Sequence, residues 1–163
     1  MAPLRKRLLI ISQSYLPRSS RGFDAYYGKD GLDYRWGRIS IGSNDFCLKP
    51  YEYTKKASLN DFSIEHDRKW VLPMLQKILA NKKLQLIASP WSPPSCLKIS
   101  HGGRLNPLYY GRYAKYIHKW LRAYADEGIR INYITPRTNL MLFSLGSRAF
   151  ILAARKRGLR TNI

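Results

Sequence analysis

The sequence predicts one α/β domain with a parallel sheet. The chain has 163 residues, of which 45% are apolar, and this length supports one hydrophobic core but not two. Three short apolar segments with strand character alternate along the chain with two long amphipathic helices. Such an order of strand, helix and strand is typical of parallel strands joined by right-handed helical crossovers.

The first strand and the first helix are predicted between residues 38 and 81. Residues 38–43 alternate between apolar and polar side chains, as in a half-buried strand, and Asp45 follows shortly after. Apolar spacing predicts a helix over 64–81 with Ser63 as its N-cap, and we expect Pro73 to kink this helix or reset its start. The apolar side chains of its buried face are Trp70, Val71, Met74, Leu75, Ile78 and Leu79.

The second half of the chain continues the alternation. Residues 84–89 form a second apolar strand, which Pro90 ends, and residues 129–135 form a third. Between them a helix is predicted over 107–127, and Gly128 closes it as a C-cap. The stripe that indicates its buried face consists of Tyr110, Tyr113, Ile117, Trp120, Leu121 and Tyr124.

Candidate site residues lie near the carboxyl ends of these strands, because parallel α/β folds carry their chemistry at that edge. Asp45, Trp91 and the residues after Thr135 occupy it. Asp45 either faces a pocket or caps local backbone amides in an Asx turn. Trp91, held in a proline-rich turn, either stacks on a sugar or base or packs against its loop. Arg38 opens its strand and either orients a carboxylate in the site or forms a structural pair.

The formal charge of +19 is concentrated at the two ends of the chain. All ten acidic residues lie within 24–135, whereas 1–23 and 136–163 hold eleven basic residues and no acidic one. The centre, with 18 basic and 10 acidic residues, carries only +8. A charge of +19 is typical of nucleic-acid binders, so a small basic α/β nucleic-acid-binding protein is the alternative function. The aromatic stripe within 107–127 is more typical of a core than of a nucleic-acid face, so no nucleic-acid partner is expected.

Other kinds of site have little support in the sequence. Cys47 and Cys96 stand apart from further ligands, and the three histidines lack ligand spacing. Neither a zinc site nor a disulfide is therefore predicted, no metal or cofactor is implied, and the two cysteines are interpreted as small buried hydrophobes. The apolar run over residues 8–11 follows basic residues but is too short for a signal peptide or a transmembrane segment.

Four stretches of the centre resemble glycoside hydrolase family 30, the glucosylceramidase-like family. They are residues 28–32, 38–46, 61–64 and 86–94. The Asn-Asp-Phe motif after the first predicted strand and the Ser-Pro-Trp motif after the second are specific, and the resemblance covers residues 24–135. It implies a (β/α)₈ TIM barrel, of which this chain supplies an incomplete part: about strands two to four with their helices.

The resemblance also implies a function, the hydrolysis of β-glycosides with retention by two glutamates roughly 5 Å apart. The expected substrate is glucosylceramide or a related β-glucoside, although β-xylosidases and β-1,6-glucanases share the central motifs. Asp45 resembles the residue that hydrogen-bonds sugar hydroxyls, Trp91 the indole that lines this subsite, and Arg38 the arginine that supports the catalytic pocket. Members of the family are often secreted or lysosomal.

The chain departs from the family after the third predicted strand. There the family carries Gln-Asn-Glu-Pro, whose glutamate is the acid/base, but this chain continues Pro136-Arg137-Thr138-Asn139-Leu140 without a carboxylate. The nucleophile is expected on a later strand, beyond residue 163. We therefore expect no catalytic residue in the chain as written and no activity. We also expect it to fold poorly, since an open piece of a barrel exposes strand edges and apolar faces.

The composition of the flanks offers an explanation for this departure. Leu, Arg and Ser, the residues with six codons, make up 24 of the 51 flanking residues but 27 of the 112 central ones, a skew expected of DNA translated in an unintended frame. Codons for a family-like segment that begins Gln-Asn-Glu-Pro can, one base later, encode residues 137–152, and a second such segment can encode residues 2–20. We therefore expect residues 24–135 to be a partial family 30 domain, with 1–23 and 136–163 as out-of-frame flanks. A natural variant with basic tails is the alternative.

Overall fold

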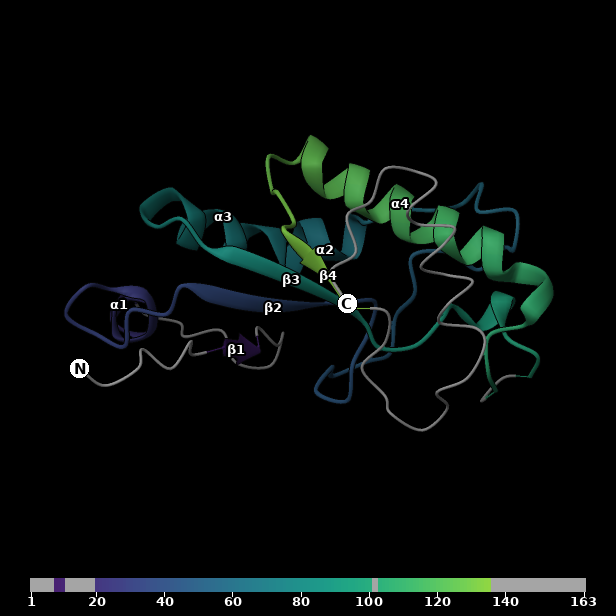
Figure 1. Cartoon of the computed structure of the whole chain (residues 1–163), viewed down its shortest axis with the longest axis horizontal. Helices are drawn as coiled ribbons and strands as arrows, with labels where there is room; N and C mark the ends of the chain where they lie inside the picture. Colours follow the sequence, from purple (N-terminus) through teal and green to yellow (C-terminus); the bar gives the residue numbers. More distant parts are fainter. Residues whose placement is uncertain (1–7, 11–19, 101–102, 136–163) are drawn as a thin grey trace.

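A computed structural model describes residues 8–10, 20–100 and 103–135. Four parallel strands form one sheet in the order β1-β2-β3-β4, so that strands that follow one another in sequence are neighbours in space (Figure 1). The strands are β1 (Leu8–Ile10), β2 (Trp36–Ile41), β3 (Gln85–Pro90) and β4 (Tyr133–Ile134). This arrangement confirms the parallel α/β prediction and is that of an arc of a barrel.

The central pair of strands carries most of the ladder. β2 and β3 are in register from Trp36 opposite Gln85 to Ile41 opposite Pro90. β1, which the sequence did not predict, pairs with β2 over residues 8–10, within the segment expected to be a flank. β4 is shorter than the strand predicted over 129–135. The first residue of the predicted segment, Ile129, instead belongs to the turn after the preceding helix, where its N–H donates to the carbonyl of Tyr124.

Three helices precede β3 in the chain. Helix α1 (Ser20–Tyr27) lies between β1 and β2, and helices α2 (Glu65–Trp70) and α3 (Leu72–Asn81) lie between β2 and β3. The single helix expected over 64–81 is thus two helices, separated at Val71. Pro73 lies in the first turn of α3, where its missing N–H costs nothing, so the proline resets the helix as expected. Trp70, predicted to be buried, is 50% exposed; it is the last residue of α2, whose buried residue is Asp67.

Helix α4 (Tyr110–Asp126) follows the short 3₁₀ helices η1 (Ser95–Leu97) and η2 (Pro107–Tyr109). It ends at Gly128, whose φ of 76° places it in the left-handed region. The N–H of Gly128 donates to the carbonyl of Ala125 and that of Ile129 to the carbonyl of Tyr124, both at 2.9 Å. These two bonds form a Schellman motif, which confirms the predicted C-cap.

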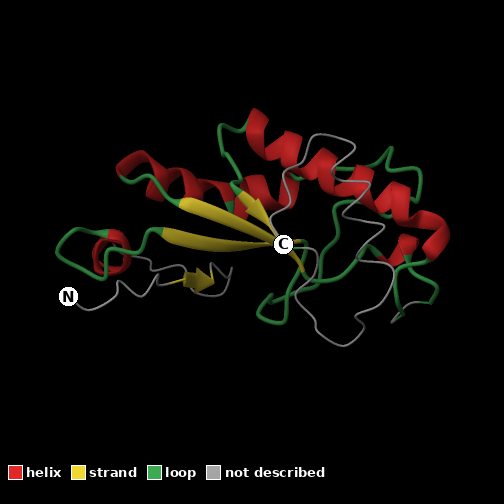
Figure 2. Cartoon of the chain, in the orientation of Figure 1, coloured by secondary structure: helices red, strands yellow, loops and turns green. Residues whose placement is uncertain are grey.

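The core lies between the sheet and helices α2, α3 and α4, which cover one of its faces (Figures 1 and 2). Every second residue of β2 faces it, and Ile39 and Ile41 are at most 1% exposed. Trp120 and Tyr124 of α4 are fully buried, so the stripe of this helix is core and is not available to stack on bases. Cys47 and Cys96 are half-buried rather than buried.

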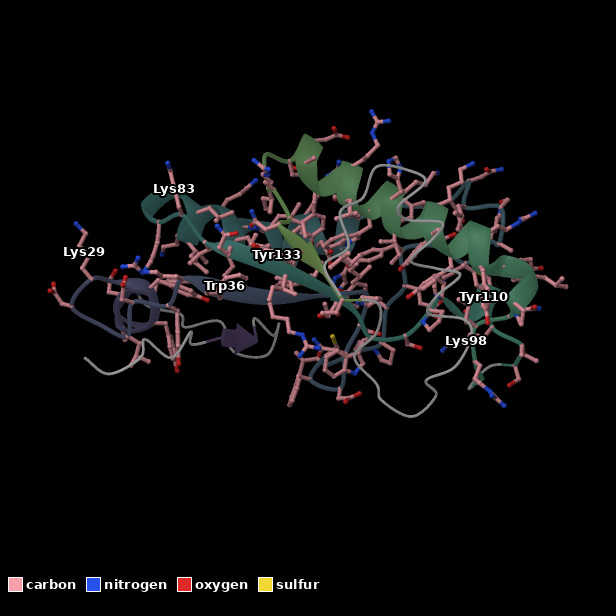
Figure 3. All side chains as sticks on the ribbon, in the orientation of Figure 1. Lys29, Trp36, Lys83, Lys98, Tyr110 and Tyr133 are labelled. Atoms are coloured by element: carbon pink, nitrogen blue, oxygen red, sulfur yellow. The ribbon has the colours of Figure 1, made fainter. Side chains whose placement is uncertain are left out.

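The opposite face of the sheet carries the alternate residues. Trp36 of β2 and Tyr133 of β4 lie on it with their rings stacked, 5.3 Å apart between centroids (Figure 3). Both are only half-buried, and in a closed barrel this face would line the interior. None of the helices that the structure describes is long and apolar enough to cross a membrane.

Candidate functional site

A chain of hydrogen bonds joins three strands near their carboxyl ends. Nε of Arg38 on β2 donates to Oγ of Ser89 on β3 at 2.9 Å. The hydroxyl of Thr135, which directly follows β4, donates to the same oxygen, also at 2.9 Å. Ser89 is fully buried and accepts both bonds, so it fixes the relative positions of the three strands at this edge. The sequence analysis did not single out Ser89, although its spacing from Trp91 places both on one face of the strand.

Arg38 and Trp91 contact each other, because β2 begins at Trp36 and Arg38 lies within the strand rather than opening it as predicted. The guanidinium carbon of Arg38 lies 5.4 Å from the centroid of the Trp91 ring, within range of a cation–π interaction. Burial lowers the pKa of Arg38, but a guanidinium keeps its proton at any ordinary pH. Its hydrogen bond goes to the neutral Ser89, and among residues 8–10, 20–100 and 103–135 no carboxylate forms an ion pair with it.

Trp91 is half-buried and its indole N–H points away from solvent. Within the described part of the chain this N–H has no hydrogen-bond acceptor. A buried donor without an acceptor costs about 1–3 kcal/mol, so such groups are uncommon in folded proteins. The ring therefore combines a stacking surface with a donor that has no partner.

Asp45 lies on an exposed loop after β2, and its neighbour forms the turn. The backbone N–H of Phe46 donates to Oδ1 of Asn44 at 2.9 Å, and Nδ2 of Asn44 donates to Ser40 at 3.1 Å. The Asx turn considered for Asp45 thus belongs to Asn44. No hydrogen bond or ion pair of Asp45 occurs within the described residues, and none joins it to Arg38 or Trp91.

A buried carboxylate supports the base of the Asp45 loop, and the sequence analysis missed it. Asp67 of α2 accepts hydrogen bonds from the hydroxyls of Tyr51 (3.1 Å), Tyr53 (2.5 Å) and Tyr124 (2.6 Å). The Tyr53 hydroxyl also accepts from the backbone N–H of Gly42, at 3.2 Å, just after β2 ends. The network therefore links α2 and α4 to the point where this loop begins.

The arrangement can bind a neutral polar ligand, but among the described residues Asp45 is the carboxylate at this edge that has no hydrogen bond or ion pair, whereas glycoside hydrolysis needs two carboxylates. A second carboxylate near this edge, Glu52, is occupied by two hydrogen bonds from Ser95, at 2.8 and 2.7 Å. Residues 136–140, where the acid/base was expected, lie outside the described residues. In the same described ranges, no three His, Cys, Asp or Glu side chains are grouped closely enough to hold a metal ion.

Comparison with known proteins identifies what this sheet and its edge are similar to. The model of the glycosyl hydrolase family 30 TIM-barrel domain matches residues 17–148. A Caenorhabditis elegans protein that carries a glucosylceramidase name is 35% identical over 120 residues, which are 65% of this chain and 23% of that protein. The lysosomal acid glucosylceramidase of Mus musculus is 30% identical over 127 residues, or 68% of this chain and 24% of the relative. The chain thus spans about a quarter of the length of these relatives.

Solved structures agree with this similarity. The endo-β1,6-glucanase BT3312 is 29% identical, with a TM-score of 0.77 over 94% of this chain and 42% of the other. SrfJ from Salmonella typhimurium superimposes with a TM-score of 0.78 at 22% identity, over 87% of this chain and 38% of the SrfJ chain. At this identity the similarity supports the fold alone. The sheet is therefore an incomplete TIM barrel, as the resemblance implied.

Proposed function

Because the chain belongs to glycosyl hydrolase family 30, we propose that its gene specifies a retaining β-glycosidase of the glucosylceramidase type. The substrate is glucosylceramide or a related β-glucoside. The observation that carries the proposal is the family match over residues 17–148, and glucosylceramidases are among the most similar relatives. The nucleic-acid alternative is not favoured, because the aromatic stripe of α4 is buried.

We assign Asp45 and Trp91 to substrate binding. Asp45 is exposed at the carboxyl edge and its carboxylate accepts hydrogen bonds from sugar hydroxyls. Trp91 is half-buried and offers the accessible part of its ring to the sugar. Arg38, anchored through Ser89, has a charge that no described carboxylate neutralises, so it can orient a catalytic glutamate.

We further propose that the polypeptide as written hydrolyses no glycoside. Its sequence has no Asp or Glu after Glu127, so the acid/base that the family places after the fourth barrel strand is missing. Residues 24–135 are then a partial catalytic domain, and residues 1–23 and 136–163 are flanks translated out of frame. The family match covers residues 17–148, so it begins seven residues before this range and ends thirteen residues after it.

Expression of the gene in both frames tests the proposal. The chain as written should not cleave 4-nitrophenyl β-glucoside, whereas the product of the restored frame should. In the restored enzyme, Asp45→Ala and Trp91→Ala should each lower kcat/KM by about a hundredfold, equivalent to about 2.7 kcal/mol of transition-state stabilisation.

Matched controls are available on the surface away from the site. Asp126→Ala removes an exposed carboxylate at the end of α4, and Trp70→Ala removes an exposed indole. Neither should change kcat/KM. A restored protein that folds but cleaves no β-glycoside would overturn the proposed function, and equal losses in site and control variants would overturn the assignment of the site.

A further inference from the structure

A row of three hydroxyl groups crosses the sheet near the carboxyl ends of its strands. Ser40 of β2 is paired with Ser89 of β3 in the register of these strands. The hydroxyls of Ser89 and Thr135 are 2.9 Å apart. Alternation along β2 and β4 places the row on the face that carries Trp36 and Tyr133. Ser89, in the middle of the row, therefore has a hydroxyl neighbour on each side.

Arg38 is attached to the middle of this row by one end of its guanidinium. A guanidinium has five N–H donors in a planar fork. The Nε donor of Arg38 is used by Ser89 at 2.9 Å, whereas the two terminal nitrogens have no hydrogen-bond partner among the described residues. Two such terminal nitrogens match the two oxygens of a carboxylate. The structure thus holds the guanidinium at one end and leaves the other end for an anion.

The groups that hold Arg38 carry no charge. A carboxylate in the place of Ser89 would neutralise the guanidinium, whereas a hydroxyl fixes its direction and leaves its positive charge intact. Ser89 is fully buried and accepts from Thr135 as well, so its oxygen has little freedom to move. The Trp91 ring, with its centroid 5.4 Å from the guanidinium carbon, is the second neighbour. Arg38 is therefore directed without being neutralised.

We propose that Ser89 is a positioning residue of the β-glycosidase reaction and acts through Arg38. This inference rests on the proposed function, in which Arg38 orients a catalytic glutamate. Because Ser89 is fully buried, it influences that glutamate only by setting the direction of the terminal nitrogens of Arg38. Rates depend strongly on such directions, since a displacement of about 1 Å can lower them about a hundredfold.

Steady-state kinetics of the restored-frame enzyme with 4-nitrophenyl β-glucoside test the proposal. Ser89→Ala removes the acceptor for Arg38 and should lower kcat about thirtyfold with little change in KM, because orientation of the glutamate is lost rather than binding of the sugar. Ser89→Thr keeps the hydroxyl and should retain most of kcat. Ser89→Cys has nearly the native volume but a weak acceptor, so it should give an intermediate kcat. It provides the same comparison should Ser89→Ala not fold.

The pH profile of kcat/KM gives a readout that a purely structural role would not move. The two limbs of the profile report the two catalytic glutamates. A fixed guanidinium lowers the pKa of the glutamate that it contacts, so its release in Ser89→Ala should raise that pKa. The corresponding limb should move to higher pH by about 0.5–1 pH unit. Ser89→Thr should keep both limbs at their wild-type positions.

Thr54→Ala is the matched control, because it removes another buried hydroxyl. Thr54 donates to Asp61 and has no described hydrogen bond with Ser89 or Arg38. Its substitution should lower the thermal midpoint but leave kcat and both limbs of the pH profile unchanged.

A double-mutant cycle with Arg38→Lys tests whether the effect passes through Arg38. Lysine lacks the planar fork, so Arg38→Lys should itself lower kcat, and Ser89→Ala should lower it no further in that background.

The outcomes separate this inference from the proposed function. A restored wild-type enzyme without activity would overturn both. An active wild type in which Ser89→Ala leaves kcat and both limbs unchanged would overturn this inference alone. The same holds for losses in Ser89→Ala that add fully to those of Arg38→Lys, and for equal losses of kcat in Ser89→Ala and Thr54→Ala.

Discussion

At the scale of single residues, Asp67 connects parts of the chain that are distant in sequence. Its carboxylate is completely buried and is satisfied by the hydroxyls of Tyr51, Tyr53 and Tyr124. A buried carboxylate is tolerated only with such partners, and removing its charge leaves hydroxyl donors without a strong acceptor. The position of the loop that carries Asp45 therefore depends on a residue far from the candidate site.

Asp67→Asn should lower the free energy of unfolding by about 3 kcal/mol, because the new amide nitrogen donates where the native oxygen accepts. Urea denaturation of the two proteins measures the difference. Asp126→Asn, which changes an exposed carboxylate in the same way, should leave stability unchanged. A loss no larger than that of the control would contradict the role given to Asp67.

The buried tyrosines predict a dependence of stability on alkaline pH. Burial raises the pKa of Tyr27 to about 12 and, together with Asp67, raises the pKa of Tyr53 and Tyr124 well above the usual value of 10.0. A raised pKa in the folded state gives stability that is fully present below pH 10 and is lost as the pH rises through the folded-state value. We expect the free energy of unfolding to be level from pH 7 to 9. Above pH 10 it should fall by about 1.4 kcal/mol per unit for each such tyrosine.

Urea titrations at a series of pH values, with tyrosinate absorbance followed in parallel, check this expectation. The absorbance change of the buried tyrosines should coincide with unfolding. Ionisation of all twelve tyrosines near pH 10 in a chain that stays folded would contradict it.

The candidate residues could be predicted from sequence more easily than their partners. Asp45 and Trp91 follow strands, so strand assignment alone places them at one edge. The partners of Asp67 are separated from it by up to 57 positions, and Ser89 accepts from residues 51 and 46 positions away. No local pattern encodes such contacts. Asn44 was missed for another reason: either of two adjacent side chains could form the Asx turn, and only the backbone geometry distinguishes them.

At the scale of elements, local sequence rules predicted the helices and strands well where one signal dominated. Gly128 ended α4 and Pro73 started α3, since each residue restricts or permits a backbone geometry directly. The break at Val71 follows from the same proline, but an apolar spacing that continues across the break concealed it. The three-residue strand β1 is too short for an alternating pattern to show.

The two glycines of α4 and its cap give a matched test of this local control. A Cβ at Gly128 or at Gly111 would meet nothing within 4 Å, so only backbone conformation separates the two sites. Gly128→Ala should lower the free energy of unfolding by about 1 kcal/mol, because φ is 76° there. Gly111→Ala, in the first turn of α4, should raise it by about 0.5 kcal/mol. Thermal or urea unfolding of both variants measures the contrast, and changes of the same sign would contradict it.

At the scale of the whole molecule, the described sheet is an arc that has not closed. Helices cover one face, whereas Trp36 and Tyr133 lie on the other, and the strands at the two sides of the arc have unpaired edges within the described residues. A parallel sheet is normally covered on both faces, and an unpaired edge is a template for association. The family match agrees with this geometry, since this chain aligns with about a quarter of its relatives' length.

We therefore expect the chain as written to self-associate as its concentration rises through the micromolar range and to bind a hydrophobic dye. Sedimentation velocity and dye fluorescence measure the two properties. The restored-frame product should show neither, because the remaining strands would close the barrel. A chain that remains monomeric without binding the dye would contradict the open-arc account.

The central claim is that the gene specifies a family 30 glycosidase whose reading frame is displaced at both ends. The most direct test is to sequence the genomic DNA across the codons for residues 17–24 and 135–138. The account predicts one base more or fewer than the written frame near each junction. The corrected frame should then encode Asn-Glu-Pro, with the acid/base glutamate, directly after the strand that contains Ile134. Fresh reads that reproduce the written frame at both junctions would contradict the claim, and this chain would then be credited with the family's fold but not with its hydrolysis.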